Sequence, residues 1–149
     1  GGNKDSAEAC VQWLRSADLA PAAGEAFLTI TGVDPDKEKL LAPVVDDPKQ
    51  DPDAPDFQPA SSPQAELPPL DADAVAAWWS AQHSQFPSSD RFFAGKPLAR
   101  QEPSAWLAAL EQANMRQRHP LALALASVSG GRQLVQTLTL CRDQHLSSA

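Results

Sequence analysis

The sequence has no tyrosine, one methionine, two cysteines and fewer cations than anions. Twelve Lys and Arg stand against nineteen Asp and Glu, which gives a net charge of -7. This balance disfavours binding to nucleic acid or to anionic lipid, because both partners require clustered cations. The chain also has no run of about 18 apolar residues and no charged segment leading into an apolar one at its start, so we expect a soluble cytoplasmic protein.

The two cysteines, Cys10 and Cys141, lie near opposite ends of the chain in apolar surroundings. A disulfide between them is compatible with this placement. We favour two reduced, buried thiols, because a secreted domain that depends on disulfides normally carries more cysteines.

Sequence signatures of catalysis and of ligand binding are absent as well. The chain has no Gly-x-Ser-x-Gly, no zinc-ligand spacing and no calcium loop, so we predict no catalytic, metal or cofactor residue and no enzyme. Residues 94–97, Ala-Gly-Lys-Pro, lack the earlier glycine and the hydroxyl residue of a phosphate-binding loop and are expected to form a turn between helices.

Residues 3–32 have the spacing of two short helices. Apolar residues recur at i, i+3, i+4 and i+7 in both halves: Ala7, Cys10, Val11 and Leu14, then Ala23, Ala26, Phe27 and Ile30. We expect Asp5 or Ser6 to cap the first helix. Pro21 suits the first turn of the second helix, and Gly32 suits its left-handed C-terminal end.

This hairpin resembles one unit of a HEAT-like solenoid, in which each repeat packs on its neighbour. Only one copy is clear, and the chain begins with Gly1-Gly2 rather than with methionine. We therefore expect upstream repeats of the same protein to be missing from this chain.

Residues 33–69 form an acidic, proline-rich arm. They hold nine prolines, nine Asp or Glu and three Lys, a net charge of -6. Because prolines interrupt helices and strand ladders, we expect an extended segment. Its expected anchors on the rest of the molecule are six apolar residues: Leu40, Leu41, Val44, Val45, Phe57 and Leu67.

Residues 70–149 are predicted to form a C-terminal helical domain, which makes the whole chain all-α. Asp71 is the expected N-cap of a first helix, and Pro103 opens a second that runs to about Arg118. We expect His119-Pro120 to break or kink this helix, and residues 121–128 to form a buried helix. Residues 132–149 suit either a helix or a strand.

Aromatic residues are concentrated in residues 78–106 of this domain. They comprise Trp78, Trp79, Phe86, Phe92, Phe93 and Trp106. Aromatic rings can stack on bases or sugars, but several of these lie on helical stripes beside aliphatic residues, so we favour core packing. Adjacent helix positions diverge by about 100°, so at least one of Trp78 and Trp79 is expected to face outward and to contact a partner.

Two sequence motifs resemble those of a family of bacterial HEAT-repeat-like proteins. Residues 23–40 match its "AGEAF…ITG(V/L)D" phrase, and residues 75–98 match its "WW…FP…R(Y/F)…G.PL" phrase, followed by the Arg-Gln-Arg helix of residues 116–118. Genes of this family resemble, in their setting, cargo clusters of the bacterial type VI secretion system. The resemblance implies an adaptor, a chaperone or a cognate partner of a secreted protein, and it carries over no catalytic residue.

We therefore predict a non-enzymatic module that binds another protein, such as a secretion cargo, toxin or spike component. The candidate contact residues are Trp78, Trp79, Arg91, Phe92, Asp46, Asp47, Asp51, Asp53 and Phe57. The charge of the arm would set the encounter rate more than the affinity.

Three alternatives stay open. The first is an immunity protein that blocks the active site of a toxin. The second is an enzyme that uses His83 with Asp90 or Glu102, and the third is a nucleic-acid-binding protein that uses the cations between Arg91 and Arg118.

Overall fold

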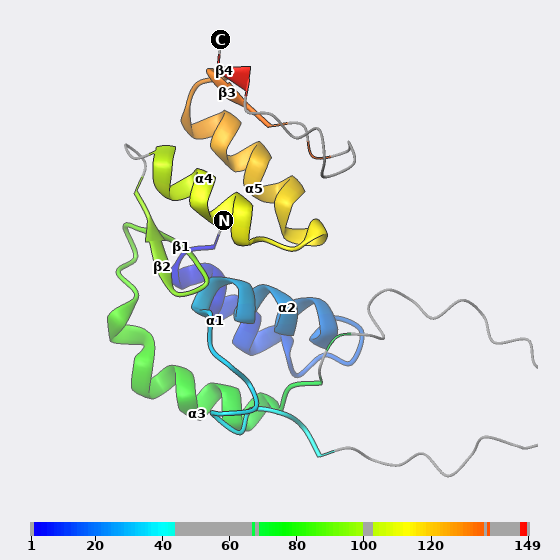
Figure 1. The fold of residues 1–149 in the computed structure, drawn as a ribbon. Helices are drawn as coiled ribbons and strands as arrows, with labels where there is room; N and C mark the ends of the chain where they lie inside the picture. The colour runs from blue at the N-terminus through cyan, green and yellow to red at the C-terminus, as the bar shows by residue number, and fades with distance from the viewer. Residues whose placement is uncertain are drawn as a thin grey trace, which may run out of the picture.

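The computed structural model describes residues 2–43, 67, 69–99, 103–135, 137 and 147–148. The elements in chain order are α1 (Lys4–Trp13), α2 (Ala20–Thr31), α3 (Ala72–Gln82), the 3-10 turn η1 (His83–Gln85), β1 (Arg91–Phe93), β2 (Lys96–Leu98), α4 (Pro103–Gln112), α5 (Met115–Val128), β3 (Gln133–Leu134) and β4 (Ser147–Ser148). In Figure 1, α1, α2 and α3 form the lower half, α4 and α5 form the upper half, and β1 and β2 join them along one side. No helix in these described ranges is long and apolar enough to cross a membrane.

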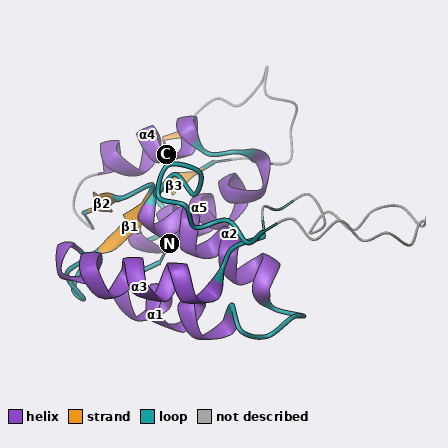
Figure 2. Cartoon of the chain, turned by 90° about the horizontal axis from the view of Figure 1, so that it is seen from below, coloured by secondary structure: helices purple, strands orange, loops and turns teal. Residues whose placement is uncertain are grey.

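The expectation of an all-α fold is wrong, because the chain is mixed α and β. β1 pairs antiparallel with β2, and β3 pairs antiparallel with β4. Figure 2 shows the β1–β2 hairpin at one edge of the helices. The expected turn between helices at residues 94–97 is instead the turn and second strand of this hairpin.

Local chemistry explains the β1–β2 hairpin. Ala94 and Gly95 both have positive φ, at 49° and 74°, as a two-residue type I′ hairpin turn requires. Pro97 lies opposite Phe92, one pair beyond the Phe93–Lys96 pair that flanks the turn. That position is a non-hydrogen-bonded pair, so the missing N–H of proline removes no bond from the ladder.

The two helices predicted within residues 3–32 are present and pack side by side (Figure 1). The predicted cap at Asp5 or Ser6 is wrong, because the Asn3 side chain accepts a hydrogen bond from the Ser6 backbone N–H at 3.0 Å and starts the helix earlier. The predicted left-handed end at Gly32 is confirmed, with φ of 65°.

The turn of the hairpin docks on the C-terminal end of α2. The Ala94 N–H donates to the Thr29 carbonyl at 2.7 Å, and the Gly95 N–H donates to the Ile30 carbonyl at 3.0 Å. The last carbonyls of a helix have no partner within the helix, so the hairpin supplies the donors that they need. This contact fixes the position of β1 relative to α1 and α2.

The two ends of the proline-rich arm lie side by side. Leu41 and Leu70 form an antiparallel bridge, and the Asp71 N–H donates to the Leu40 carbonyl at 2.8 Å. Leu40 is buried, as expected of an anchor, with 1% of its surface exposed. Of the other predicted anchors, Val44, Val45 and Phe57 lie outside the described residues.

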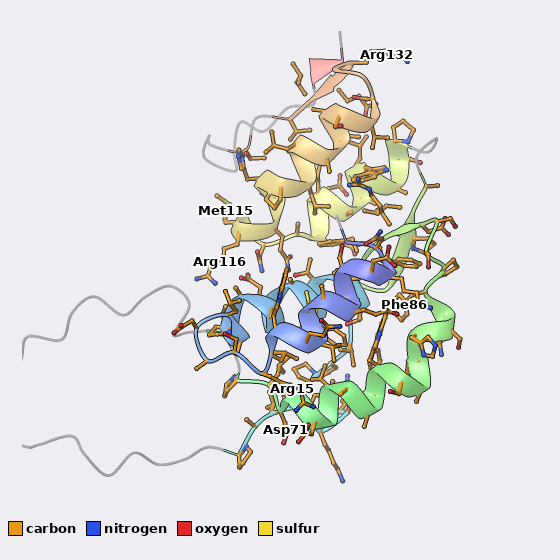
Figure 3. All side chains as sticks on the ribbon, turned by 180° about the vertical axis from the view of Figure 1, so that it is seen from behind. Arg15, Asp71, Phe86, Met115, Arg116 and Arg132 are labelled. Atoms are coloured by element: carbon orange, nitrogen blue, oxygen red, sulfur yellow. The ribbon has the colours of Figure 1, made fainter. Side chains whose placement is uncertain are left out.

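Helix α3 begins where it was predicted, with Asp71 as the N-cap. It packs against α1, and an ion pair of 2.7 Å joins Arg15 to Asp73 at its first turn. In Figure 3, Arg15 lies beside the N-terminal end of α3, close to the labelled Asp71.

The predicted boundary at His119-Pro120 is wrong. α4 ends at Gln112, and Asn114 caps α5 through a capping box with Gln117. The capping box is the stronger helix-start signal, so Pro120 falls inside α5 and not at its start. The helix predicted over residues 121–128 is present, but it is not buried all round: Leu121, Ala122 and Leu125 are buried, whereas Leu123 is 59% exposed.

Two hydrophobic cores meet at β1. The first lies among α1, α2, α3, Leu40, Phe86 and Phe92, and the second lies among α4, α5, Phe93 and Leu98. Adjacent residues of a strand point to opposite faces, so Phe92 enters one core and Phe93 enters the other. The division into residues 3–32, 33–69 and 70–149 stays a prediction.

Candidate functional site

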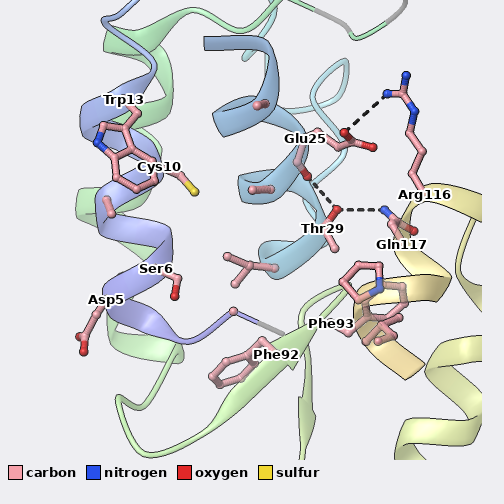
Figure 4. A pocket seen from close by; sticks show the side chains of 17 residues that line it. Asp5, Ser6, Cys10, Trp13, Glu25, Thr29, Phe92, Phe93, Arg116 and Gln117 are labelled. Atoms are coloured by element: carbon pink, nitrogen blue, oxygen red, sulfur yellow. Dashed lines mark hydrogen bonds and ion pairs between the residues drawn. The ribbon is translucent and has the colours of Figure 1, made fainter. Parts of the chain in front are cut away.

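An open groove of about 660 Å³ lies where the N-terminal helices approach α5. Its walls come from α1, α2, β1 and the first two turns of α5 (Figure 4). The lining is largely apolar and includes three small residues of α1 and α2: Ala9, Ala22 and Ala26. A concave apolar surface with a few polar groups is the usual form of a binding site.

The α1 wall of the groove follows from a spacing of four residues. Asp5, Ala9 and Trp13 lie at i, i+4 and i+8, on a face next to the buried stripe of Ala7, Cys10 and Leu14. Trp13 is 54% exposed at the end of this wall. An exposed indole on the rim of a groove is a favourable contact for a partner, since aromatic residues dominate the energy of many interfaces.

Polar contacts join α2 to α5 along the opposite rim. The Gln117 side chain donates to the Thr29 hydroxyl at 2.9 Å, and Arg116 lies 3.6 Å from the Glu25 carboxylate. Thr29 in turn donates to the Glu25 carbonyl at 2.7 Å. Figure 4 shows these contacts as a row across one side of the groove, facing α1. They hold α5 at a set distance from the N-terminal helices and so keep the groove open.

Cys10 lies in the wall of this groove but is itself buried, with 4% of its surface exposed. Burial raises the pKa of its thiol, because a low-polarity environment disfavours the thiolate. Cys10 is a free cysteine, as predicted, while Cys141 lies outside the described residues.

We expect Cys10 to react slowly with a thiol reagent in the folded protein. The thiolate is the reactive form, and both the raised pKa and the burial reduce its availability. In a Cys141→Ser background, the rate of reaction with a disulfide reagent at pH 8 should rise at least about 100-fold when urea unfolds the chain. Equal rates in buffer and in urea would contradict the buried position.

The predicted contact residues of α3 and β1 differ in how far their side chains are exposed. Trp79 and Phe92 are buried, whereas Trp78 is half-buried and Arg91 is exposed. The rings form a continuous chain: Phe27 lies 5.8 Å from Trp78 and 5.9 Å from Trp79, Trp79 lies 5.4 Å from Phe86, and Phe86 lies 5.0 Å from Phe92. These rings pack α2, α3 and β1 together, and only Phe92 among them lines the groove.

The described residues show no hydrogen bond between His83 and Asp90, two of the residues proposed for an enzyme. The His83 Nδ1 donates to the Ser80 carbonyl at 3.0 Å, and the Asp90 carboxylate accepts a hydrogen bond from the Ser89 hydroxyl at 3.0 Å. Glu102 lies outside the described residues. His83 shares a shallow depression with Glu8 and Trp79, and no hydrogen bond joins its ring to a carboxylate within the part of the chain that the structure describes.

The four arm aspartates proposed as contacts, Asp46, Asp47, Asp51 and Asp53, lie outside the described residues, as does Phe57. Within the described ranges, no group of three or more His, Cys, Asp or Glu could hold a metal ion.

The sequence analysis did not single out the residues of the groove. Trp13 carried a usable signal, because it is a large apolar residue that falls between the positions of the buried stripe of α1. Ala9, Ala26 and Gln117 carried none, since alanine and glutamine are ordinary helix residues.

Comparison of the chain with protein-family models, with curated proteins and with solved structures gives no match. The resemblance to a HEAT-repeat-like family therefore stays a prediction. The function has to be argued from the groove itself.

Proposed function

We propose that this chain is a non-enzymatic protein-binding module of the cytoplasm, which takes an apolar segment of a partner protein into the groove between α1, α2 and α5. The observation that carries the proposal is the groove itself, a concave apolar surface of about 660 Å³ with an exposed tryptophan on its rim. A partner that covered it would remove this surface from water, which is the main driving force of association.

The composition of the groove favours binding over chemistry. Its ionisable side chains are Asp5, Cys10, Glu25 and Arg116, and Glu25 lies beside Arg116 across the rim. Nucleophilic catalysis needs a nucleophile next to a base, but the Ser6 hydroxyl donates to the Asn3 side chain, the Thr29 hydroxyl donates to the Glu25 carbonyl, and the Cys10 thiol has a raised pKa.

The acidic arm supports the same proposal through its charge. Residues 33–69 carry -6 of the net charge of -7, and a concentrated negative charge speeds the approach of a basic partner. A type VI secretion cargo as that partner remains what the family resemblance implies.

Filling the groove tests the proposal. We expect Ala9→Leu to raise the Kd of the complex at least about tenfold while leaving the melting temperature nearly unchanged, because its side chain projects from α1 into the groove and not into a core. Ala77→Leu is the matched control, since Ala77 is an exposed alanine of α3 away from the groove.

The partner is first captured by photo-crosslinking in a lysate of the source organism, with benzoylphenylalanine in place of Trp13, and its affinity for each variant is then measured by calorimetry. A captured protein that binds the Ala9→Leu and Ala77→Leu variants equally tightly would refute binding through the groove.

A further inference from the structure

Among the described residues, the groove offers an incoming chain few free backbone groups. Three of its walls are helices, whose amide and carbonyl groups are bonded along their own axes except for N–H groups in the first turns of α1 and α5. The fourth wall, β1, pairs with β2 on one edge, and on the other edge the Phe92 N–H donates to the Gly2 carbonyl at 2.8 Å. An extended peptide in this groove would leave most of its backbone groups without partners, at about 1–3 kcal/mol for each buried group.

A helix does not meet this difficulty, because its backbone groups bond to one another. The small side chains of Ala9, Ala22 and Ala26 in the α1 and α2 walls allow the backbone of such a helix to approach closely. Asp5 and Trp13 mark the two ends of the α1 wall (Figure 4), eight residues apart. That separation corresponds to about 12 Å, or roughly two helical turns.

The rim of the groove favours a cation on that helix. Asp5 is exposed at one end of the α1 wall and forms no ion pair with any residue that the structure describes. Trp13, at the other end, presents an indole ring that can also receive a cation. The chain as a whole carries a net charge of -7, which repels an acidic ligand.

We propose that the ligand of the groove is a basic amphipathic α-helix of the partner protein. Its apolar residues at i, i+3 or i+4, and i+7 contact the alanines of α1 and α2, and a Lys or Arg at one end of that stripe pairs with Asp5. This inference rests on the proposed function and specifies the kind of segment that the groove accepts.

Synthetic peptides test the inference on the full chain by fluorescence anisotropy. The probe is a labelled helical 15-residue peptide of Leu, Ala and Lys with one apolar stripe. Two further peptides have the same apolar residues, one with two central prolines that prevent a helix and one with Glu in place of every Lys. We expect the helical basic peptide to bind at least about tenfold more tightly than either of the others.

A pair of variants locates the charge contact. Asp5→Lys should weaken binding of the helical basic peptide about fivefold at low salt, and less at high salt, because it places a like charge at the proposed contact. Glu8→Lys makes the same charge change on the same helix but at a position that does not line the groove, so its effect should be smaller.

Equal binding of the proline peptide, equal effects of Asp5→Lys and Glu8→Lys, or no binding of the helical basic peptide would overturn the inference. The proposed function is tested separately from this inference. If the protein captured through position 13 binds less tightly to Ala9→Leu but the peptides do not bind, the groove binds a partner through another kind of segment.

Discussion

Gly32→Ala is expected to lower the free energy of unfolding by about 3 kcal/mol or more. Gly32 ends α2 with φ of 65°, and a Cβ atom added to it would lie 2.3 Å from the carbonyl carbon of Ala94. That atom belongs to the backbone of the hairpin turn, so it cannot move aside without breaking the bonds from Ala94 and Gly95 to α2. Urea unfolding followed by tryptophan fluorescence measures the change.

Gly130→Ala provides a matched control for this prediction. Gly130 has nearly the same backbone conformation, with φ of 63°, but nothing lies within 4 Å of a Cβ atom added to it. The control should therefore show only the conformational penalty of about 1–2 kcal/mol for a left-handed residue. Equal losses in the two variants would show that the hairpin does not press against the end of α2.

Trp79→Ala is expected to lower the free energy of unfolding by about 3–5 kcal/mol. The Trp79 ring is 6% exposed and lies between the rings of Phe27 and Phe86, so its removal opens a cavity in the core that joins α2, α3 and β1. Differential scanning calorimetry measures the loss. If the variant does not fold, Trp79→Phe retains one aromatic ring and should show a smaller loss in the same direction.

The neighbouring Trp78→Ala is the control, because it deletes the same side chain one position along the same helix. Trp78 is half-buried and meets Phe27 at its edge, so we expect a loss of about 1–2 kcal/mol. A larger loss for Trp78→Ala than for Trp79→Ala would contradict the assignment of Trp79 to the core.

Much of the helical structure could be predicted because its signals are local. The apolar stripes of residues 3–32 and the last-turn glycine at Gly32 depend on neighbours within about one or two helical turns. The cap at Asp71 also depends on near neighbours, because its side chain accepts hydrogen bonds from the N–H groups of Asp73 and Ala74 at 2.8 and 3.0 Å.

Competing local signals explain the errors at the other boundaries. Pro120 suggested a break, but the capping box of Asn114 and Gln117 set the start of α5 earlier. The Ala94-Gly95 pair suggested a turn between helices, but the aromatic residues before it favour a strand. The Phe92 N–H bonds to Gly2, and the Ala94 and Gly95 N–H groups bond to α2. Those partners lie some 60 to 90 residues away in the sequence, so no local sequence pattern indicates them.

The aromatic residues show what the sequence could and could not establish. It predicted that most rings of residues 78–106 pack in a core, and the structure buries Trp79, Phe86, Phe92, Phe93 and Trp106. It did not predict that Phe92 and Phe93 belong to different cores, because that division depends on the strand conformation of β1.

The sequence by itself determined the positions of the apolar stripes, the cap at Asp71, the end of α2 at Gly32 and the charge of the arm, because each depends on composition or on near neighbours. Only the tertiary structure decided that α1, α2 and α5 leave a groove with Trp13 on its rim. A groove is the space that packed elements leave between them, so it depends on where the hairpin turn and the Thr29–Gln117 contact hold those elements.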